Sequence, residues 1–433
     1  MSDNNKIGYW GIVAIGVGGM VGGGIFAVLG LAVQLAHGGT ALAFAIAGIV
    51  ALLTTYSYAK LSVTFPSQGG TVMFLDKAFG PGLFAGSLNI LLWLSYIIML
   101  SLYSYAFGSY AATFLPPEWQ AAGKHAFISL GIVGITALNL LGAGLIGRAE
   151  SWIVAFKIII LLLFVGVGLW GIEPARLQPA AWSSPVQVVA GGFIIFLAYE
   201  GFELIANAAQ DARNPARTLP YAYYSAVVFV IILYILVAVV TVGNLPVAQI
   251  VEAKDYALAA AAKPFLGNTG FRVIAIAAML STASAINATL YGAARLSYII
   301  AKEGELPSVL EKKIWRKPIL GLLITTGLTL LAANLFNLNS IATIGSSGFL
   351  LIFTSVNIAN ARLAERTGSS RWLSWLGALT CLLALIALLW QTEMQSPIKL
   401  LILVAMIGVS AGIESFFRLF RQRFRTKQAT EKT

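Results

Sequence analysis

The chain has 433 residues, of which 58% are hydrophobic and only 10% are charged, and its mean hydropathy is +0.84. A chain this apolar cannot form the polar surface of a soluble globular protein, so we expect a polytopic protein embedded in a lipid bilayer. The formal net charge of +11 suggests nucleic acid binding, but the distribution of the basic residues along the chain argues against it.

Apolar segments of about 20 residues, each long enough to cross about 30 Å of hydrocarbon, recur along the whole chain. Proline, glycine and charged residues separate them. We predict an all-α fold of twelve transmembrane helices, at residues 7–36, 41–65, 83–115, 125–144, 151–171, 188–209, 221–242, 271–301, 319–336, 341–361, 372–391 and 398–417. A short amphipathic linker is expected at 66–82, and an external loop with one short helix at 244–270.

The basic residues predict the orientation. An even number of spans places both termini on one side, and 21 Lys and Arg residues lie on that side against six on the other, with Lys157 inside span 5. Cytoplasmic loops carry the excess of Lys and Arg, so both termini are expected in the cytoplasm, with 418–433 as a basic cytoplasmic tail. This asymmetry explains the positive charge without a nucleic acid partner.

Span 1 has an unusual composition for a helix that only crosses lipid. Residues 14–30 contain seven glycines, and glycine in a helix interior costs about 1 kcal/mol relative to alanine. Broken membrane helices occur where a cavity uses the freed backbone groups, so we predict a break here. Close helix packing through small residues such as Gly18 and Gly22 is the alternative interpretation.

Span 6 contains a second unusual feature, the two carboxylates Glu200 and Glu203 on either side of Gly201 and Phe202. Acidic side chains inside a membrane are costly and usually face a cavity or a partner, although a purely structural pairing of Glu203 is an alternative. Spans 1 and 6 are the first members of two five-span blocks, 7–171 and 188–361. Because five is odd, the blocks cross the membrane in opposite directions, and broken helices at corresponding positions of such a repeat mark a substrate site.

Several segments together resemble the amino acid–polyamine–organocation (APC) transporters, and the similarity runs along most of the chain. They are MVGGGIF at 20–26, SQGGTVMFLDKAFG at 67–80, AYEGFE at 198–203, NPARTLP at 214–220 and NATLYGAARLSYIIAKEGELP at 287–307. The resemblance implies the LeuT-type fold, in which helices 1 and 6 of a five-plus-five inverted repeat are broken and two further helices (372–417) follow. It also implies transport of amino acids or amines.

The chemistry of the two breaks is consistent with a zwitterionic ligand. The amides of Gly22, Gly23 and Gly24 would lie at the positive end of a half-helix and suit a carboxylate, whereas carbonyl groups at the span 6 break suit an ammonium. Tyr199 and Phe202 would form a gate or wall, or only pack. The full set of predicted substrate-binding residues is Val21, Gly22, Gly23, Gly24, Ile25, Ser95, Met99, Phe196, Leu197, Ala198, Tyr199, Glu200, Phe202 and Asn287.

Lys157 is a buried cation in the apolar run IVAFKIIILLLF. It either extends to the membrane edge or stays inside. In the proton-coupled branch that the chain resembles, a lysine on span 5 occupies the place of a bound sodium ion. The resemblance then places Lys157 near the carbonyl of Gly18 and the hydroxyls of Ser281 and Ser284, and gives Glu203 the place of an acid that relays protons. Burial lowers the pKa of a lysine, which would let it load and release a proton.

The sequence has no GxxxxGK[ST] phosphate loop, no His/Cys metal spacing and no nucleophile elbow, so we expect no cofactor, no metal and no enzymatic activity. We predict a proton-coupled importer of amino acids in the cell membrane. The alternatives are an exchanger of an amino acid for an amine or another amino acid, and a membrane sensor or channel that keeps the fold without coupled transport.

Overall fold

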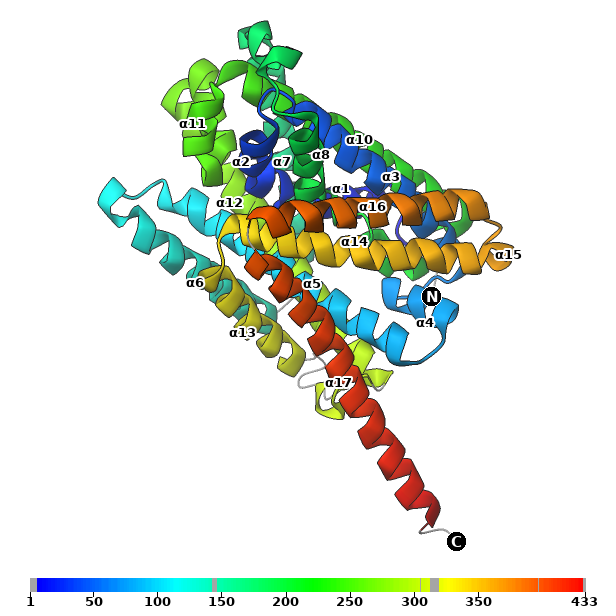
Figure 1. The fold of residues 1–433 in the computed structure, drawn as a ribbon. Coiled ribbons are helices and arrows are strands. Elements are labelled where there is room, and N and C mark those ends of the chain that lie inside the picture. The colour runs from blue at the N-terminus through cyan, green and yellow to red at the C-terminus, as the bar shows by residue number, and fades with distance from the viewer. Residues whose placement is uncertain (1–5, 142–145, 304, 312–318, 396, 431–433) are drawn as a thin grey trace.

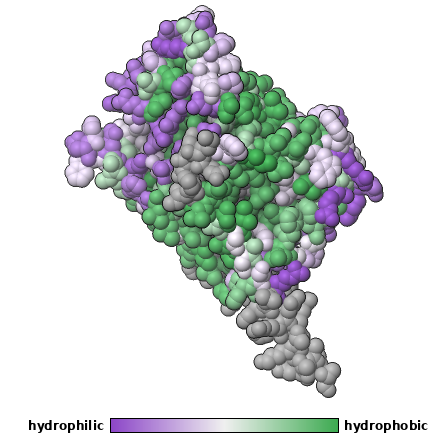
Figure 2. Space-filling view, viewed as in Figure 1, coloured by the Kyte–Doolittle hydropathy of each residue, from purple (hydrophilic) through white to green (hydrophobic). Residues whose placement is uncertain are grey.

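The computed structural model of the chain describes residues 6–141, 146–303, 305–311, 319–395 and 397–430. These residues form helices and two isolated β-bridges, and they contain no strand. A broad apolar band covers the middle of the molecule, with hydrophilic residues gathered at its two ends (Figure 2). The predicted all-α membrane fold is confirmed.

The helices follow one another with short connections. The first half of the chain contains α1 (Tyr9–Met20), α2 (Gly24–Ala36), α3 (Thr40–Thr64), α4 (Thr71–Phe79), α5 (Leu83–Ala112), α6 (Pro117–Leu141), α7 (Ile146–Gly168), η2 (Leu169–Gly171), η3 (Pro174–Leu177), η4 (Pro179–Ala181), α8 (Pro185–Ile194), η5 (Ile195–Tyr199), α9 (Leu204–Asn207) and η6 (Ala209–Asp211). The second half contains α10 (Pro215–Asn244), α11 (Val247–Glu252), η7 (Lys254–Tyr256), α12 (Ala257–Lys302), η8 (Ser308–Glu311), α13 (Ile319–Leu335), α14 (Leu338–Arg362), α15 (Ala364–Thr367), α16 (Arg371–Gln395) and α17 (Pro397–Thr430).

Within the described residues, ten helices are long and apolar enough to cross a membrane, and the bent pair of α1 and α2 adds an eleventh span. α13 is also apolar but has only 17 residues. At 1.5 Å per residue it is about 26 Å long, at the lower limit for a membrane span. Counting α13 gives the predicted twelve.

One segment differs from the prediction. The expected external loop at 244–270 is largely helical, because α12 already begins at Ala257 and continues through Pro264. The run ALAAAA at 257–262 has a high helix propensity, which outweighs the proline. α12 changes direction only at Gly267, where φ is +63°. In the predicted basic tail at 418–433, α17 continues as a helix through Thr430.

α5 is central and buried along most of its length. α14 and α16 lie side by side across one side of the molecule, and α6 and α13 lie beside α5 (Figure 1). The N-terminus, α4, α15 and the end of α17 lie on one face, which we call the N-terminal face, whereas α11 lies on the opposite face.

Candidate functional site

Span 1 is interrupted where its glycines are most dense. α1 ends at Met20, the next three residues form a turn, and α2 begins at Gly24 at an angle of 44° to α1. The break is as predicted, but the amide of Gly22 is already used, because it donates to the carbonyl oxygen of Gly19 over 3.2 Å. The last turn of α1 tightens into an i→i+3 bond. The amides that begin α2, starting at its N-cap Gly23, have no partner within the helix, and the amide of Ile25 has the Tyr234 hydroxyl as a hydrogen-bonding neighbour.

Span 6 is interrupted at its carboxylates. α8 continues directly into η5, and a four-residue turn, 200–203, then separates η5 from α9. Gly201 in this turn has a φ of +118°, a conformation that residues with a Cβ rarely adopt. Both breaks therefore depend on glycine, the first for a turn and the second for a left-handed backbone.

The two breaks are in direct backbone contact. A Cβ atom on Gly24 would lie 2.8 Å from the Cα and the carbonyl oxygen of Ala198. A Cβ atom on Gly201 would lie 2.5 Å from the carbonyl carbon of Gly19. Only glycine permits these approaches. The amide end of α2 thus lies beside the carbonyl end of η5.

A tyrosine from a third helix connects the breaks. The hydroxyl of Tyr234 on α10 donates to the carbonyl oxygen of Met20 over 2.7 Å and lies 3.3 Å from that of Ala198. Its ring packs against Tyr199 with 5.2 Å between the centroids. The Tyr199 hydroxyl points away from the breaks and donates to the carbonyl oxygen of Phe44 on α3 (2.9 Å).

A serine from α12 contacts the first break. The Ser281 hydroxyl lies 2.9 Å from the carbonyl oxygen of Val21 and also donates to that of Gly22. Ser284, one turn further along α12, is buried as well. Freed backbone carbonyls at membrane depth need such donors, and α12 supplies one of them.

The carbonyl groups predicted to bind an ammonium are only partly available. The carbonyl of Leu197 accepts from the amide of Glu200 over 3.2 Å, and that of Ala198 lies near the Tyr234 hydroxyl. Ser346 of α14 accepts from the amide of Leu197 (3.2 Å) and so holds the end of η5 in place. The carbonyl of Phe196 lies inside η5, a 3-10 helix over Ile195–Tyr199 whose carbonyls accept i→i+3 bonds.

Glu203 is almost fully buried, with 1% of its surface exposed. One carboxylate oxygen accepts from the amide of Gly201 at 2.7 Å, and the other accepts from the hydroxyl of Tyr96 on α5 at 3.1 Å. The side chain therefore holds the turn at the span 6 break and ties it to α5, which is a structural pairing.

Glu200 is also buried, and its carboxyl group has the side chains of Glu203 and Tyr103 as hydrogen-bonding neighbours. The ring of Tyr103 lies directly against span 1, since a Cβ atom on Gly23 would be only 2.2 Å from it. Through Tyr103, Glu200 is thus placed next to the amide end of α2.

Lys157 lies in α7 with 1% of its surface exposed. Its ammonium group donates to the carbonyl oxygen of Gly18 over 2.9 Å, so the side chain points into the protein and does not extend to the membrane edge. Gly18 itself packs against Val154, one turn before Lys157, because a Cβ atom on Gly18 would lie 3.0 Å from a methyl carbon of that valine. A buried cation is therefore in contact with the end of α1, just before the break.

The remaining predicted side chains, Phe202, Ser95, Met99 and Asn287, contact different parts of the helix bundle. Phe202 packs on the rings of Tyr58 and Phe353, as one of an aromatic cluster between α3 and α14. Ser95 and Met99 are buried on α5, and Ser95 faces α14. The side-chain oxygen of Asn287 accepts a hydrogen bond from Asn139 of α6 over 2.7 Å. This partner belongs to neither broken span.

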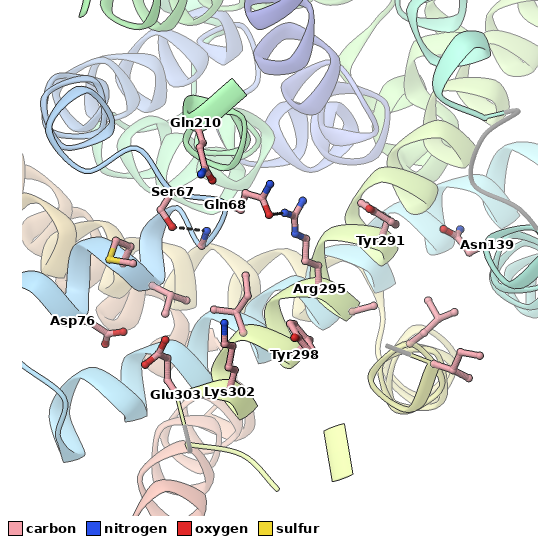
Figure 3. A pocket seen from close by; sticks show the side chains of 17 residues that line it. Ser67, Gln68, Asp76, Asn139, Gln210, Tyr291, Arg295, Tyr298, Lys302 and Glu303 are labelled. Carbon is pink, nitrogen blue, oxygen red and sulfur yellow. Dashed lines mark hydrogen bonds between the residues drawn. The ribbon is translucent and has the colours of Figure 1, made fainter. Parts of the chain in front are cut away.

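Two cavities approach this region from the N-terminal face. The outer cavity has a volume of about 510 Å³ and is drawn in Figure 3. The inner cavity, of about 340 Å³, is lined by Tyr96, the residue that donates to Glu203. The two cavities share five lining residues, which are Gln68, Gly69, Tyr291, Arg295 and Ile299.

A group of acidic residues lies near the outer cavity. The side-chain amide of Asn89 donates to Asp76 of α4 over 3.1 Å and to Glu305, just after α12, over 2.9 Å. Burial, with the nearby carboxylates as a further cause, raises the pKa of Asp76 to about 6 and that of Glu305 to about 8. These raised pKa values bring the titration of both carboxyl groups toward neutral pH.

Sequence reasoning missed four residues of this region, and each is a hydroxyl-bearing residue in an apolar span. They are Tyr96, Tyr103, Tyr234 and Ser346. A buried hydroxyl generally needs a partner, which is the signal that the sequence offered. Nothing local in the sequence identifies that partner as a broken helix.

Comparison with known proteins is consistent with this geometry. The chain matches the amino acid permease family over residues 7–411. It is 40% identical to an uncharacterized protein of Methanocaldococcus jannaschii over 372 residues, which cover 85% of each chain. It is 34% identical to the inner membrane transport protein YbaT of Escherichia coli, with 94% of this chain and 95% of that one covered. With the branched-chain amino acid permease BcaP of Bacillus subtilis it shares 25% identity, over 82% of this chain and 80% of the relative. The broken spans and their buried charges thus belong to a multi-pass membrane transporter, and the chain is a member of the amino acid permease family of the APC superfamily.

Proposed function

We propose that this chain is a secondary active transporter that imports amino acids by proton symport with alternating access. Family membership supports transport over catalysis. The observation that carries the coupling proposal is the contact between the Lys157 ammonium and the Gly18 carbonyl, because it puts a titratable cation at the base of the span 1 break.

The substrate would be held by its backbone charges. Its carboxylate would bind the first amides of α2, at Gly23, Gly24 and Ile25, where the helix dipole is positive. Its ammonium would bind at the end of η5, where the carbonyl oxygen of Ala198 has two lone pairs and the Tyr234 hydroxyl uses at most one of them. These two groups of atoms come from spans that touch through Gly24 and Ala198.

The proton would be carried by Lys157. In its charged form the ammonium neutralises carbonyl oxygens near the end of α1, as a bound metal cation would. In its neutral form it makes a weaker hydrogen bond, so the end of α1 is held less firmly to α7. Loading and release of one proton would thus change the attachment of span 1 during the cycle.

The architecture we propose is the LeuT type. Residues 7–171 and 188–361 form the two inverted repeats, 372–417 the two additional spans, and 418–433 a basic segment. The termini would be cytoplasmic, as the 21 basic residues on their side indicate, and the protein would lie in the cell membrane. The N-terminal face and its two cavities would then open to the cytoplasm.

The test is uptake into proteoliposomes with each of the twenty radiolabelled amino acids, with an imposed inward proton gradient and without sodium. We expect uptake of at least one amino acid, abolished by collapse of the gradient. Uptake that needs sodium would contradict proton coupling. No uptake of any amino acid under any gradient would favour a sensor or a channel.

An exchanger is the second candidate, and the position of Glu200 favours it. This carboxyl group lies beside the amide end of α2 and would suit a second cationic group of the substrate, such as that of an amine. Preloading the proteoliposomes with amines decides between the two functions. Uptake that requires a preloaded amine and ignores the proton gradient would establish exchange.

A further inference from the structure

The two cavities of the N-terminal face adjoin each other. The outer one is lined by Asp76, Lys302 and Glu303, whereas the inner one reaches Leu92 and Tyr96 on α5. Their shared lining lies on the turn after α3 and on one stretch of α12. A molecule that moves from Tyr96 to this face by way of the outer cavity therefore passes the shared residues.

One hydrogen bond crosses that passage. The guanidinium of Arg295 on α12 donates to the side-chain oxygen of Gln68 (Figure 3). The turn that carries Gln68 is itself held, because the Ser67 hydroxyl accepts from the amide of Gly69 at 3.0 Å. Figure 3 shows Arg295 directed across the cavity toward Gln68, with Asp76 and Glu303 at the other end.

Among the described residues, no acidic side chain forms an ion pair with Arg295. Its described partner is a neutral amide, and none of the three salt bridges of the described residues involves it. Asp211 also lines the inner cavity but forms no such ion pair with it. A guanidinium binds a carboxylate in bidentate fashion and more strongly than it binds an amide oxygen. A carboxylate ligand therefore competes favourably with Gln68.

We propose that Arg295 binds the carboxylate of the substrate in transit, and that Gln68 holds Arg295 across the passage until the substrate displaces it. This inference rests on the proposed transport of amino acids. It assigns a second carboxylate site, separate from the amides of α2, at the boundary between the two cavities. The substrate class follows from it, since a molecule without a carboxylate displaces Gln68 much less readily than one with a carboxylate.

The first test strengthens the Gln68 contact. Gln68→Glu replaces the neutral partner with a carboxylate, so the passage stays closed for longer and kcat falls by about fivefold, while KM at the opposite face is unchanged. Gln210→Glu is the matched control, because Gln210 lines the same outer cavity and has no described bond to Arg295. We expect it to keep kcat within about twofold of wild type. The double variant Gln68→Glu, Arg295→Gln relieves the block.

The second test measures the carboxylate contact itself. In vesicles that expose the N-terminal face, Arg295→Gln raises KM by about tenfold or more for the amino acid that gives the largest uptake in the twenty-amino-acid panel. Arg295→Lys recovers part of this loss. The primary amide of the same amino acid shows no change between wild type and Arg295→Gln, because it has no carboxylate to lose.

These results separate the inference from the proposed function. If wild type transports amino acids but Gln68→Glu behaves like Gln210→Glu, or if Arg295→Gln raises KM equally for the acid and the amide, only the role of Arg295 is wrong. If wild type transports none of the twenty amino acids, the proposed function fails and the role of Arg295 fails with it.

Discussion

The hydroxyl of Tyr234 on α10 lies 2.7 Å from the carbonyl oxygen of Met20, the last residue of α1. The same hydroxyl is 3.3 Å from the carbonyl oxygen of Ala198 at the other break. One side chain thus supplies a donor to the interrupted ends of both broken spans, which otherwise have no helical partner for these groups.

Tyr234→Phe should lower both stability and transport. Without the hydroxyl, two buried carbonyl groups lose their donor, which costs about 1 to 3 kcal/mol of unfolding free energy. Thermal unfolding in detergent and uptake in proteoliposomes measure the two effects. Tyr223→Phe is the control, because its hydroxyl pairs with Ser62 of α3 at 2.9 Å and not with a break. Equal transport loss in both variants would show that the contact with the breaks has no special role.

A substitution that adds one methyl group, Gly24→Ala, tests the contact between the two breaks. Gly24→Ala places a Cβ atom 2.8 Å from the backbone of Ala198, which must then move away from α2. We expect substrate binding, measured by thermal shift with the transported amino acid, to be lost while the protein still purifies as a folded species. Gly166→Ala on α7 is the control, since its Cβ atom would meet nothing within 4 Å. Wild-type binding by the Gly24→Ala variant would remove this contact from the site.

Lys157→Met tests proton coupling. A methionine has a similar volume but neither titrates nor donates to Gly18, so proton-driven uptake should fall sharply and lose its dependence on external pH. Lys60→Met is the control, because Lys60 is near the surface and donates to the Gly368 carbonyl. Undiminished proton-driven uptake by Lys157→Met would move the coupling role to Glu203, and Glu203→Gln would then be the variant that loses it.

The acidic group at the N-terminal face predicts how stability depends on pH. Burial raises the pKa of Glu305 from 4.5 to about 8, so the folded state binds this proton more tightly than the unfolded state does. Its stabilising effect is complete below pH 4.5 and is lost as the pH rises through about 8. The pKa of Asp76 is raised from 3.8 to about 6, so its contribution to stability also decreases as the pH rises through this range.

Glu305→Gln should therefore abolish the decrease of the melting temperature between about pH 6 and pH 8 and leave only the smaller decrease due to Asp76 below about pH 6. A glutamine oxygen can still accept from Asn89. The exposed Glu118, at the start of α6, provides the control variant Glu118→Gln. A wild-type melting temperature that is flat or rises across this range would contradict the assignment.

Orientation is tested by labelling of introduced cysteines. In a Cys381→Ala background, Glu118→Cys should react with an impermeant thiol reagent from outside the cell. Glu365→Cys, near α15, should react only after permeabilisation, because its face carries most of the basic residues. Cys381 is buried, so its replacement removes no accessible thiol. The reverse labelling pattern would invert the topology and the side on which the cavities open.

The sequence by itself determined the membrane class and the positions of both breaks. Hydropathy over about 20 residues decides where a helix can cross lipid, and glycines inside such a run destabilise the helix locally. Both properties depend on the local sequence and not on tertiary contacts. The buried charges Lys157, Glu200 and Glu203 were readable for the same reason, since burying a charge in a membrane is costly wherever its partner lies. The helix at 257–266 was not predicted, because Pro264 indicated a loop, whereas the helix propensity of the alanine-rich run at 257–262 is the stronger effect.

Only the tertiary structure decided which groups satisfy the broken backbone. Tyr234 contacts Met20 across 214 residues of sequence, and Ser281 contacts Val21 across 260. A hydroxyl in an apolar span has the same local sequence signature whether it bonds its own helix, as Ser95 does with Leu91, or a distant break. The packing of the spans brings Gln68 and Arg295 together in the same way. Hydrogen-bond partners are short-range in space and not in sequence, so the residues that complete the site emerge only when the helices are assembled.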